Sequence, residues 1–218
     1  CAGIVGYTKG DVLCCDNFGY VSSQGNGFPS TAGIVGAIND ADVVIDFSNA
    51  AAVDELLDYC EKKEIPVVLC TTGLSEEQLA RVEEVSKKVA VLKSANMSLG
   101  INTLMELLRK AALVFGPAGF DMEIVEKHHN LKIDAPSGTA KSLADIVDAN
   151  MGVHTDIQSV RCGEIPGIHT IGYEGGNDRI TMTHEAFSRE GFAAGAVEAA
   201  LRTEGLTGVH EFKDLFFN

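Results

Sequence analysis

Residues 41–70 read ADVVIDFSNAAAVDELLDYCEKKEIPVVLC, and this stretch decides the fold class. The β-branched runs at 42–47 and 65–70 each predict a buried strand. Between them, four apolar residues recur at the spacing of one helix face: Val53, Leu56, Leu57 and Cys60. The stretch therefore predicts a strand, a helix and a second strand in succession.

The same alternation continues into the middle of the chain. Ser75 predicts a helix start, because Gln78 completes a capping box with it. A strand at 89–92 then leads into a helix over 100–115. Repeated strand–helix units with continuous apolar strands indicate a parallel sheet that is covered on both faces.

Ligands of such sheets bind beyond the carboxyl ends of the strands. The loops that follow Phe47, Cys70 and Lys93 are therefore expected to line one crevice.

The rhythm changes from Phe120 onward. A strand at 120–126 and a helix at 137–149 are followed by strands near 157–160, 169–173 and 179–183. This order predicts an α+β arrangement with a mixed sheet. We expect two domains, residues 1–96 rejoined by 187–218 and residues 97–186, with a final helix over 189–202 that packs on the first.

Composition excludes several classes of protein. The 218 residues carry Asp+Glu 31 against Lys+Arg 17, a net charge of −14, which argues against a nucleic-acid binder. With 45% hydrophobic and 22% charged residues the chain resembles an ordinary globular protein, and no apolar run approaches the ~20 residues of a membrane span. Six cysteines without a CxxC pair favour reduced thiols in a soluble, cytoplasmic protein.

The chain begins at Cys1 with a strand-like run, without Met or a signal-peptide pattern. We expect that an upstream segment is missing. A lipid-anchored Cys1 is the alternative, although a polar tether normally follows such an anchor.

Residues 123–140, EIVEKHHNLKIDAPSGTA, carry the chemistry. A strand ends at His128 and His129, and a loop with Lys132 then leads to a helix N-terminus. The free N–H groups there, the helix dipole and the hydroxyls of Ser137 and Thr139 suit a carboxylate or phosphate. Gly138 allows close approach, and the lysine and histidines add positive charge or proton donors.

Each part also has a simpler explanation. A His-His pair is usually two ordinary polar residues, and neighbours on a strand point to opposite faces, so the pair is not expected to share a metal ion. A Ser/Thr-rich helix start is usually a cap. The combination within one short stretch favours a site for an anionic small molecule, without a metal.

The stretch resembles the signature of 4-hydroxy-tetrahydrodipicolinate (dihydrodipicolinate) reductases, E-x-H-H-x-x-K-x-D-A-P-S-G-T-A, and residues 126–140 match it at every fixed position. Further segments resemble the family in the same order, at residues 43–48, 71–73, 94–102, 160–165 and 188–192.

The resemblance implies that residues 1–96 with 187–218 form a Rossmann-like dinucleotide-binding domain and that residues 97–186 form a substrate-binding and oligomerisation domain. It also implies NADH or NADPH as cofactor, a small anionic dicarboxylate substrate and a homotetramer. The reaction would be the reduction of 4-hydroxy-tetrahydrodipicolinate to tetrahydrodipicolinate in lysine and diaminopimelate biosynthesis.

By position in the signature, His128 would donate or accept a proton, and Lys132 would protonate the carbon next to the reduced one. Three residues would hold the substrate carboxylates: His129, Gly138 and Thr139. Two segments would line the nicotinamide and ribose: Cys70, Thr71, Thr72 and Gly73, and Ser94, Ala95, Asn96 and Met97. On simpler readings, Thr71–Gly73 is an ordinary turn, Asn96 is a cap and Arg161 is a surface charge.

The sequence also departs from the family. The resemblance aligns Cys1–Tyr7 with the second strand of the family's fold, so the preceding glycine-rich loop that cradles the pyrophosphate is missing. Without the first strand, we expect exposed sheet edges. The segment between the helix at Ser137 and Val160 is shorter than in the family. Pro166 and Ile168 replace Val and Glu, and a proline suits a turn or a sheet edge.

These departures keep a second hypothesis open, a non-catalytic binding or assembly protein derived from the family. An amino-acid dehydrogenase on the same scaffold is a weaker rival, because such enzymes lack the His-His-x-x-Lys and Pro-Ser-Gly-Thr combination.

Overall fold

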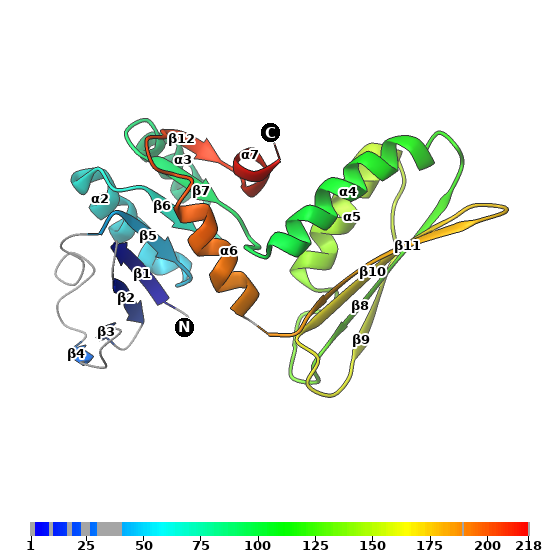
Figure 1. Ribbon diagram of the computed structural model, residues 1–218, viewed down its shortest axis with the longest axis horizontal. Coiled ribbons are helices and arrows are strands. Elements are labelled where there is room, and N and C mark those ends of the chain that lie inside the picture. Colours follow the sequence, from blue (N-terminus) through cyan, green and yellow to red (C-terminus); the bar gives the residue numbers. More distant parts are fainter. Residues whose placement is uncertain are drawn as a thin grey trace. The chain divides into compact units, whose positions relative to one another are not determined.

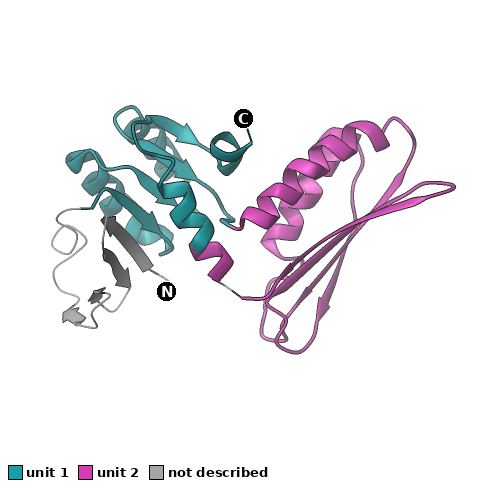
Figure 2. Cartoon of the chain, viewed as in Figure 1, with its two compact units in different colours: residues 1–97, 194–218 teal, residues 98–193 magenta. Residues whose placement is uncertain are grey.

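The computed structural model describes residues 3–8, 11–16, 19–22, 27–29, 41–188 and 190–217. The chain divides into two units, residues 1–97 with 194–218 and residues 98–193 (Figure 2). Each unit has hydrophobic clusters of its own, so each has a core that could support its fold.

The first unit contains a parallel sheet (Figure 1). Four strands pair in parallel, in the order β12 (Gly208–His210), β7 (Ala90–Lys93), β6 (Val67–Leu69) and β5 (Val43–Asp46). Four helices accompany them: α2 (Val53–Lys63), α3 (Glu76–Ser86), α6 (Glu190–Ala200) and α7 (Phe212–Phe216). The α/β prediction for this part of the chain is confirmed.

The sheet is buried on both faces. Val44, Val67 and Leu69 point toward a cluster that includes α2 and α3. Their neighbours Val43 and Val68 point to the opposite cluster, where residues of α6 and α7 pack. Alternation along each strand thus explains why these strands read as continuous apolar runs.

The N-terminal strands differ from the prediction. Residues 3–29 contain four strands in the described positions, β1 (Gly3–Thr8), β2 (Asp11–Asp16), β3 (Gly19–Ser22) and β4 (Gly27–Pro29). All three successive pairs are antiparallel, and β1 is also antiparallel to β5. The strand expected at Cys1–Tyr7 is present as β1, but it is antiparallel to both of its neighbours, so the parallel arrangement expected for it was wrong. The strands β2, β3 and β4 were not predicted. Cys1 and Ala2 lie outside the described residues. Connections as short as Lys9-Gly10 cannot make a crossover, so successive strands form hairpins. We expected an exposed sheet edge here, but the edge of β5 is paired with β1.

The helices of this unit follow their local signals. The predicted inner face of α2, with Val53, Leu56, Leu57 and Cys60, is buried. The capping box of α3 is formed, since Gln78 N donates to Ser75 Oγ at 3.2 Å and Ser75 N donates to Gln78 Oε1 at 3.1 Å. The short elements β12 and α7 were not predicted, because three to five residues carry no readable periodicity.

The second unit is a sheet covered by two helices (Figure 1). Its strand order is β11 (Arg179–Ala186), β10 (Gly167–Glu174), β8 (Asp121–His128) and β9 (Ile157–Arg161). Only the β8–β9 pair is parallel among these, so the mixed sheet is confirmed. The helices α4 (Leu99–Phe115) and α5 (Gly138–Met151) share a core with the sheet, built around Leu108, Ile124, Leu143, Ile171 and Tyr173. Pro166 lies directly before β10, as expected for a turn.

Candidate functional site

The end of β8 presents a buried polar face. Ile124, Glu126 and His128 are buried, whereas Lys127 between the last two is exposed. This is the alternation of a strand with one face on the core. His129 follows the strand and is half-buried, so the two histidines do not share one face.

Glu126 is the centre of this face and is 0% exposed. Arg161 donates to both of its oxygens, Nη1 to Oε2 and Nη2 to Oε1, each at 2.8 Å. His128 Nδ1 lies 2.5 Å from Oε2, and Ser137 N donates to Oε1 at 3.2 Å. Burial would raise the pKa of Glu126, but the hydrogen bonds from Arg161 and His128 outweigh it and lower the pKa to about 2. Glu126 is therefore a carboxylate at neutral pH.

His169 from β10 lies beside His128. The two rings meet edge to face with centroids 5.2 Å apart, and His169 Nε2 lies 3.2 Å from Ser137 Oγ. His169 is 4% exposed, and burial, with the nearby His128, lowers its pKa to about 4. The His169 imidazole is thus neutral at neutral pH. Gly167 also lies beside His128, because a Cβ there would lie 3.1 Å from His128 Nε2.

Lys132 lies in the loop between β8 and α5. Its ammonium pairs with Asp134, with 2.8 Å between Nζ and Oδ1. The lysine lowers the pKa of this carboxyl, and the backbone N–H of Gly138 adds a smaller effect in the same direction. Gly138 is the first residue of α5, which Ser137 caps by accepting from Ala140 N. One carboxylate is therefore stabilised both by the lysine and by the N-terminus of α5.

The structure thus places the predicted residues of the second unit around the junction of β8 and α5. Gly138 is exposed and Thr139 is half-buried at the helix start, while the His129 carbonyl accepts from Lys132 N at 3.1 Å. Glu126 and His169 were missed as partners of His128. A signal for Glu126 existed, because a residue two positions before His128 shares its strand face.

Arg161 is not the simple surface charge that one interpretation allowed. Besides the two bonds to Glu126, its Nη2 donates to the Asp134 carbonyl at 2.6 Å. β9 runs parallel to β8 with Arg161 opposite His128, and this pairing brings the guanidinium to the buried carboxylate.

In the first unit, the loops after β5, β6 and β7 are joined to one another. Cys70 N donates to the Asp46 carbonyl at 2.9 Å, and Ser94 N donates to the Leu69 carbonyl at 3.2 Å. Asp46 is fully buried, and its Oδ1 accepts from Ser48 N at 2.9 Å. Within the described residues, Asp46 Oδ2 and Thr71 Oγ1 are buried without a hydrogen-bond partner.

Buried polar atoms without partners are rare in folded proteins. At the carboxyl edge of a parallel sheet, an acceptor and a hydroxyl of this kind fit a ligand rich in hydroxyl groups, such as the ribose of a dinucleotide. Asp46 was not among the predicted site residues, although it ends the strand that decides the fold.

The other predicted cofactor residues lie in the same loops. Burial raises the pKa of the Cys70 thiol, and Asp46 adds to it, so the thiol is protonated. Gly73 has a positive φ of 76°, which suits glycine in a turn. Thr72, Gly73 and Ala95 are exposed. Ser94 Oγ donates to the Asn96 carbonyl at 2.8 Å, whereas the Met97 side chain is buried in the core and can offer only its backbone.

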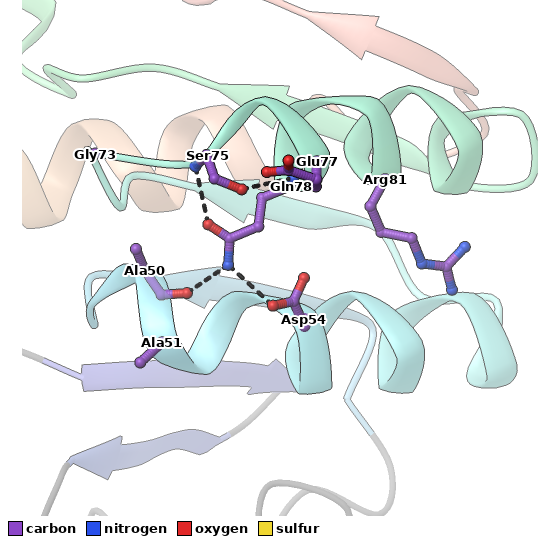
Figure 3. Close-up of a pocket in the computed structure, with 8 residues that line it drawn as sticks. All are labelled: Ala50, Ala51, Asp54, Gly73, Ser75, Glu77, Gln78 and Arg81. Atoms are coloured by element: carbon purple, nitrogen blue, oxygen red, sulfur yellow. Dashed lines mark hydrogen bonds between the residues drawn. The ribbon is translucent and has the colours of Figure 1, made fainter.

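An open pocket of about 570 Å³ lies between α2 and α3 (Figure 3). Figure 3 shows Gln78 reaching across it, where Nε2 donates to the Ala50 carbonyl at 2.7 Å and to Asp54 Oδ2 at 3.0 Å. Arg81 is paired with Asp58 and Glu61. The polar groups of this pocket serve helix packing, so the pocket is not the candidate site.

Two features are absent from the described part of the chain. No group of three or more His, Cys, Asp or Glu residues there could hold a metal ion. No helix in the same residues has both the length and the apolar character needed to span a bilayer.

Comparison with known proteins agrees with this architecture. Residues 8–97 match the family model "Dihydrodipicolinate reductase, N-terminus", and residues 100–216 match "Dihydrodipicolinate reductase, C-terminus". A 4-hydroxy-tetrahydrodipicolinate reductase of Caldanaerobacter subterraneus is 44% identical over 207 residues, covering 86% of this chain and 82% of the relative. The same enzyme of Clostridium tetani is 40% identical over 195 residues, covering 82% and 76%.

Among solved structures, the dipicolinate-bound dihydrodipicolinate reductase of a Paenisporosarcina species has a TM-score of 0.73 at 24% identity, covering 81% of this chain and 74% of that one. This likeness concerns the fold. The family models cover nearly the whole described chain, and the relatives are similar over most of their own length. The chain therefore belongs to the dihydrodipicolinate reductase family.

Proposed function

We propose that this chain reduces 4-hydroxy-tetrahydrodipicolinate to tetrahydrodipicolinate with NADH or NADPH, a step of lysine and diaminopimelate biosynthesis. Family membership supports the reaction. The observation that carries the residue assignment is the arrangement of Lys132 and the Gly138 N–H around a single carboxylate, that of Asp134.

The position of Asp134 supports this assignment. A carboxylate between an ammonium and a helix N-terminus is stabilised by charge and by the free N–H groups of the first turn. The Asp134 carboxyl is about half exposed, with a side-chain exposure of 54%, so a ligand can replace it. A carboxylate of the substrate would take this position, with Thr139 and His129 nearby at the same helix start and strand end.

Lys132 and His128 would then handle the proton. Loss of the hydroxyl group as water would convert the substrate to a conjugated cyclic imine. Hydride addition to this imine builds negative charge on the resulting enamine, and a nearby ammonium stabilises this charge and delivers a proton to carbon. General acid catalysis of this kind contributes about 10²–10⁴-fold. His128 would exchange a proton with the ring nitrogen of the substrate or with Lys132.

The first unit would hold the dinucleotide, whose reduced nicotinamide supplies the hydride when bound. Asp46 Oδ2 would accept a hydrogen bond from a ribose hydroxyl, and Thr71 Oγ1 would donate or accept one, because both atoms are buried without partners among the described residues. The exposed backbone at Thr72 and Gly73 leaves room for the ligand to approach.

The Lys132→Ala variant tests the assignment. We expect turnover to fall by about 10²-fold or more, while the affinity for NAD(P)H changes less than about twofold, because the lysine acts in the second unit on the substrate. Turnover is followed by loss of NAD(P)H absorbance with freshly generated substrate, and binding by nicotinamide fluorescence. Lys127→Ala is the matched control, since this lysine is exposed near the end of β8, just before the loop that carries Lys132. Equal loss of turnover and of cofactor binding in Lys132→Ala would contradict the assignment.

The same assay addresses the non-catalytic alternative, which family membership does not favour. A binding or assembly protein would bind ligands without turnover, both in this chain and in a version extended upstream. Turnover in either form excludes it.

We also propose that the chain forms a homotetramer. Large apolar side chains are exposed in the second unit, with Leu131 at 87%, Ile133 at 99% and Phe187 at 86%, and exposed apolar groups of this size favour association. Light scattering measures the mass directly, and a monomer at micromolar concentration would exclude the tetramer.

A further inference from the structure

We infer that Glu126, held in place by Arg161, is a positioning residue that fixes the His128 ring with its Nδ1–H toward the protein and its Nε2 toward the substrate. This inference rests on the proposed function, because it concerns how His128 exchanges a proton.

The geometry at His128 Nδ1 defines the tautomer. Glu126 Oε2 lies 2.5 Å from Nδ1, and the Glu126 side chain is fully buried. An ionised carboxylate can only accept hydrogen bonds, so Nδ1 must carry the proton. In the neutral ring, Nε2 then bears the lone pair, and in the charged ring it bears the second proton. Proton exchange with a ligand is therefore directed to Nε2.

Arg161 keeps Glu126 in the accepting state. A buried carboxylate without a partner would be protonated or would leave the interior, because desolvation penalises its charge. The guanidinium binds both oxygens at 2.8 Å, and this fork holds the carboxylate plane as well as its charge. The Ser137 backbone N–H, at 3.2 Å from Oε1, ties the same carboxylate to the start of α5. One side chain thus fixes the relative placement of β8, β9 and α5 around His128.

The surroundings of Nε2 are consistent with this orientation. No described residue forms a hydrogen bond with His128 Nε2. On the neighbouring strand β10, Gly167 lies next to the His128 ring, and a Cβ there would lie 3.1 Å from Nε2 and 3.4 Å from Cδ2. The adjacent His169 binds Ser137 Oγ with its own Nε2 and does not compete for Glu126.

Glu126→Gln tests the inference. The amide keeps the size of the side chain but has no charge and offers its N–H groups as well as its oxygen, so Nδ1 is no longer forced to be the donor. We expect kcat to fall about 10²-fold, within the range of general acid–base effects, with KM for NAD(P)H changed less than about twofold. The direct readout is ¹⁵N NMR of the imidazole: Nδ1–H dominates in the original chain, and a mixture of tautomers appears in Glu126→Gln.

Glu123→Gln is the matched control. Glu123 lies on the same strand and also pairs with an arginine, Arg179, but on an exposed surface. It should change neither kcat nor the His128 spectrum.

Glu126→Gln leaves the Arg161 charge without its partner and could lower stability. The double variant Glu126→Gln/Arg161→Gln removes both charges and separates the roles. If the pair only stabilises the fold, the double variant recovers both melting temperature and kcat. If Glu126 positions His128, the double variant recovers melting temperature while kcat stays low and the tautomers stay mixed.

The outcomes distinguish this inference from the proposed function. No turnover by the original chain would remove the proposed function, and the NMR comparison would still test the orientation of His128. Normal turnover with an unchanged kcat in Glu126→Gln would overturn the positioning role and leave the proposed reaction standing. An unchanged Nδ1–H signal in Glu126→Gln would also overturn it.

Discussion

The neutral state of His169 predicts a specific loss of stability in mild acid. Burial lowers the pKa of this imidazole from an ordinary value near 6.5 to about 4, so the unfolded chain takes up a proton that the folded chain rejects. Stability therefore rises with pH across this window and falls as the pH drops from 6.5 toward 4. At about 1.4 kcal/mol per pKa unit, the neutral His169 contributes about 3 kcal/mol to the free energy of unfolding at high pH. About 2 kcal/mol of this contribution is lost by pH 5.

The comparison that isolates this contribution uses His169→Gln. Glutamine does not titrate, and its amide can still bind Ser137 Oγ. Because all other ionisable groups are the same in both proteins, the difference between them reports on His169. Urea unfolding is followed by tyrosine fluorescence, since Tyr173 is buried in the core of the same unit. Between about pH 7 and pH 5, we expect the free energy of unfolding of the original chain to fall by about 2 kcal/mol more than that of His169→Gln.

A direct titration of the imidazole protons completes the test. His169 should keep the chemical shifts of a neutral ring down to about pH 5. Parallel stability curves for the two proteins over the whole range, or a His169 midpoint near 6.5, would refute the account of this residue as a buried neutral imidazole.

Three further substitutions have defined outcomes. Gly167→Ala places a Cβ 3.1 Å from His128 Nε2, so it should lower kcat at least several-fold. The NAD(P)H affinity, measured by fluorescence titration, should not change. In the control Gly176→Ala the added Cβ meets no atom within 4 Å, so kcat should not fall. Thr71→Val removes a buried hydroxyl without a described partner, so thermal stability should stay level or rise, while the NAD(P)H Kd should increase about fivefold to tenfold in the same titration. Ser75→Ala removes the N-cap of α3 and should cost about 1 kcal/mol in urea unfolding, with Ser75→Thr close to the original; no change would show that the cap is dispensable.

The parallel part of the fold could be predicted because its signals are local. The apolar stripe of α2 and the capping box of α3 each lie within a few residues, and both are confirmed. The antiparallel pairing of β1 to β4 could not be predicted in the same way, since the direction and register of a strand depend on its pairing partners rather than on its own pattern.

The same distinction applies to the site. His128 and Lys132 were visible because they stand in one contiguous motif with the start of α5. Arg161 and His169 come from other strands, and Arg161 lies 35 residues from Glu126 in sequence. Only the parallel pairing of β8 with β9 and the antiparallel pairing with β10 bring them to one end of the sheet. Nothing in the periodicity of a single strand encodes that register.

The pairing of charges also changes the explanation of how this acidic chain would attract the dicarboxylate substrate of the proposed function. The sequence suggested free positive charge, but Arg161 and Lys132 are each already bound to a carboxylate of the chain. The two pairs differ in strength: removing a partner from a buried pair costs about 3–5 kcal/mol, whereas an exposed pair contributes about 0–1 kcal/mol. Glu126 is fully buried, and the Asp134 side chain is 54% exposed. Under the proposed function, a substrate carboxylate would therefore displace Asp134 from Lys132 at little cost, but it would not displace Glu126 from Arg161. Under the proposed function, Lys132 would be the cation available to the substrate, whereas Arg161 would stay bound to Glu126, the partner of His128.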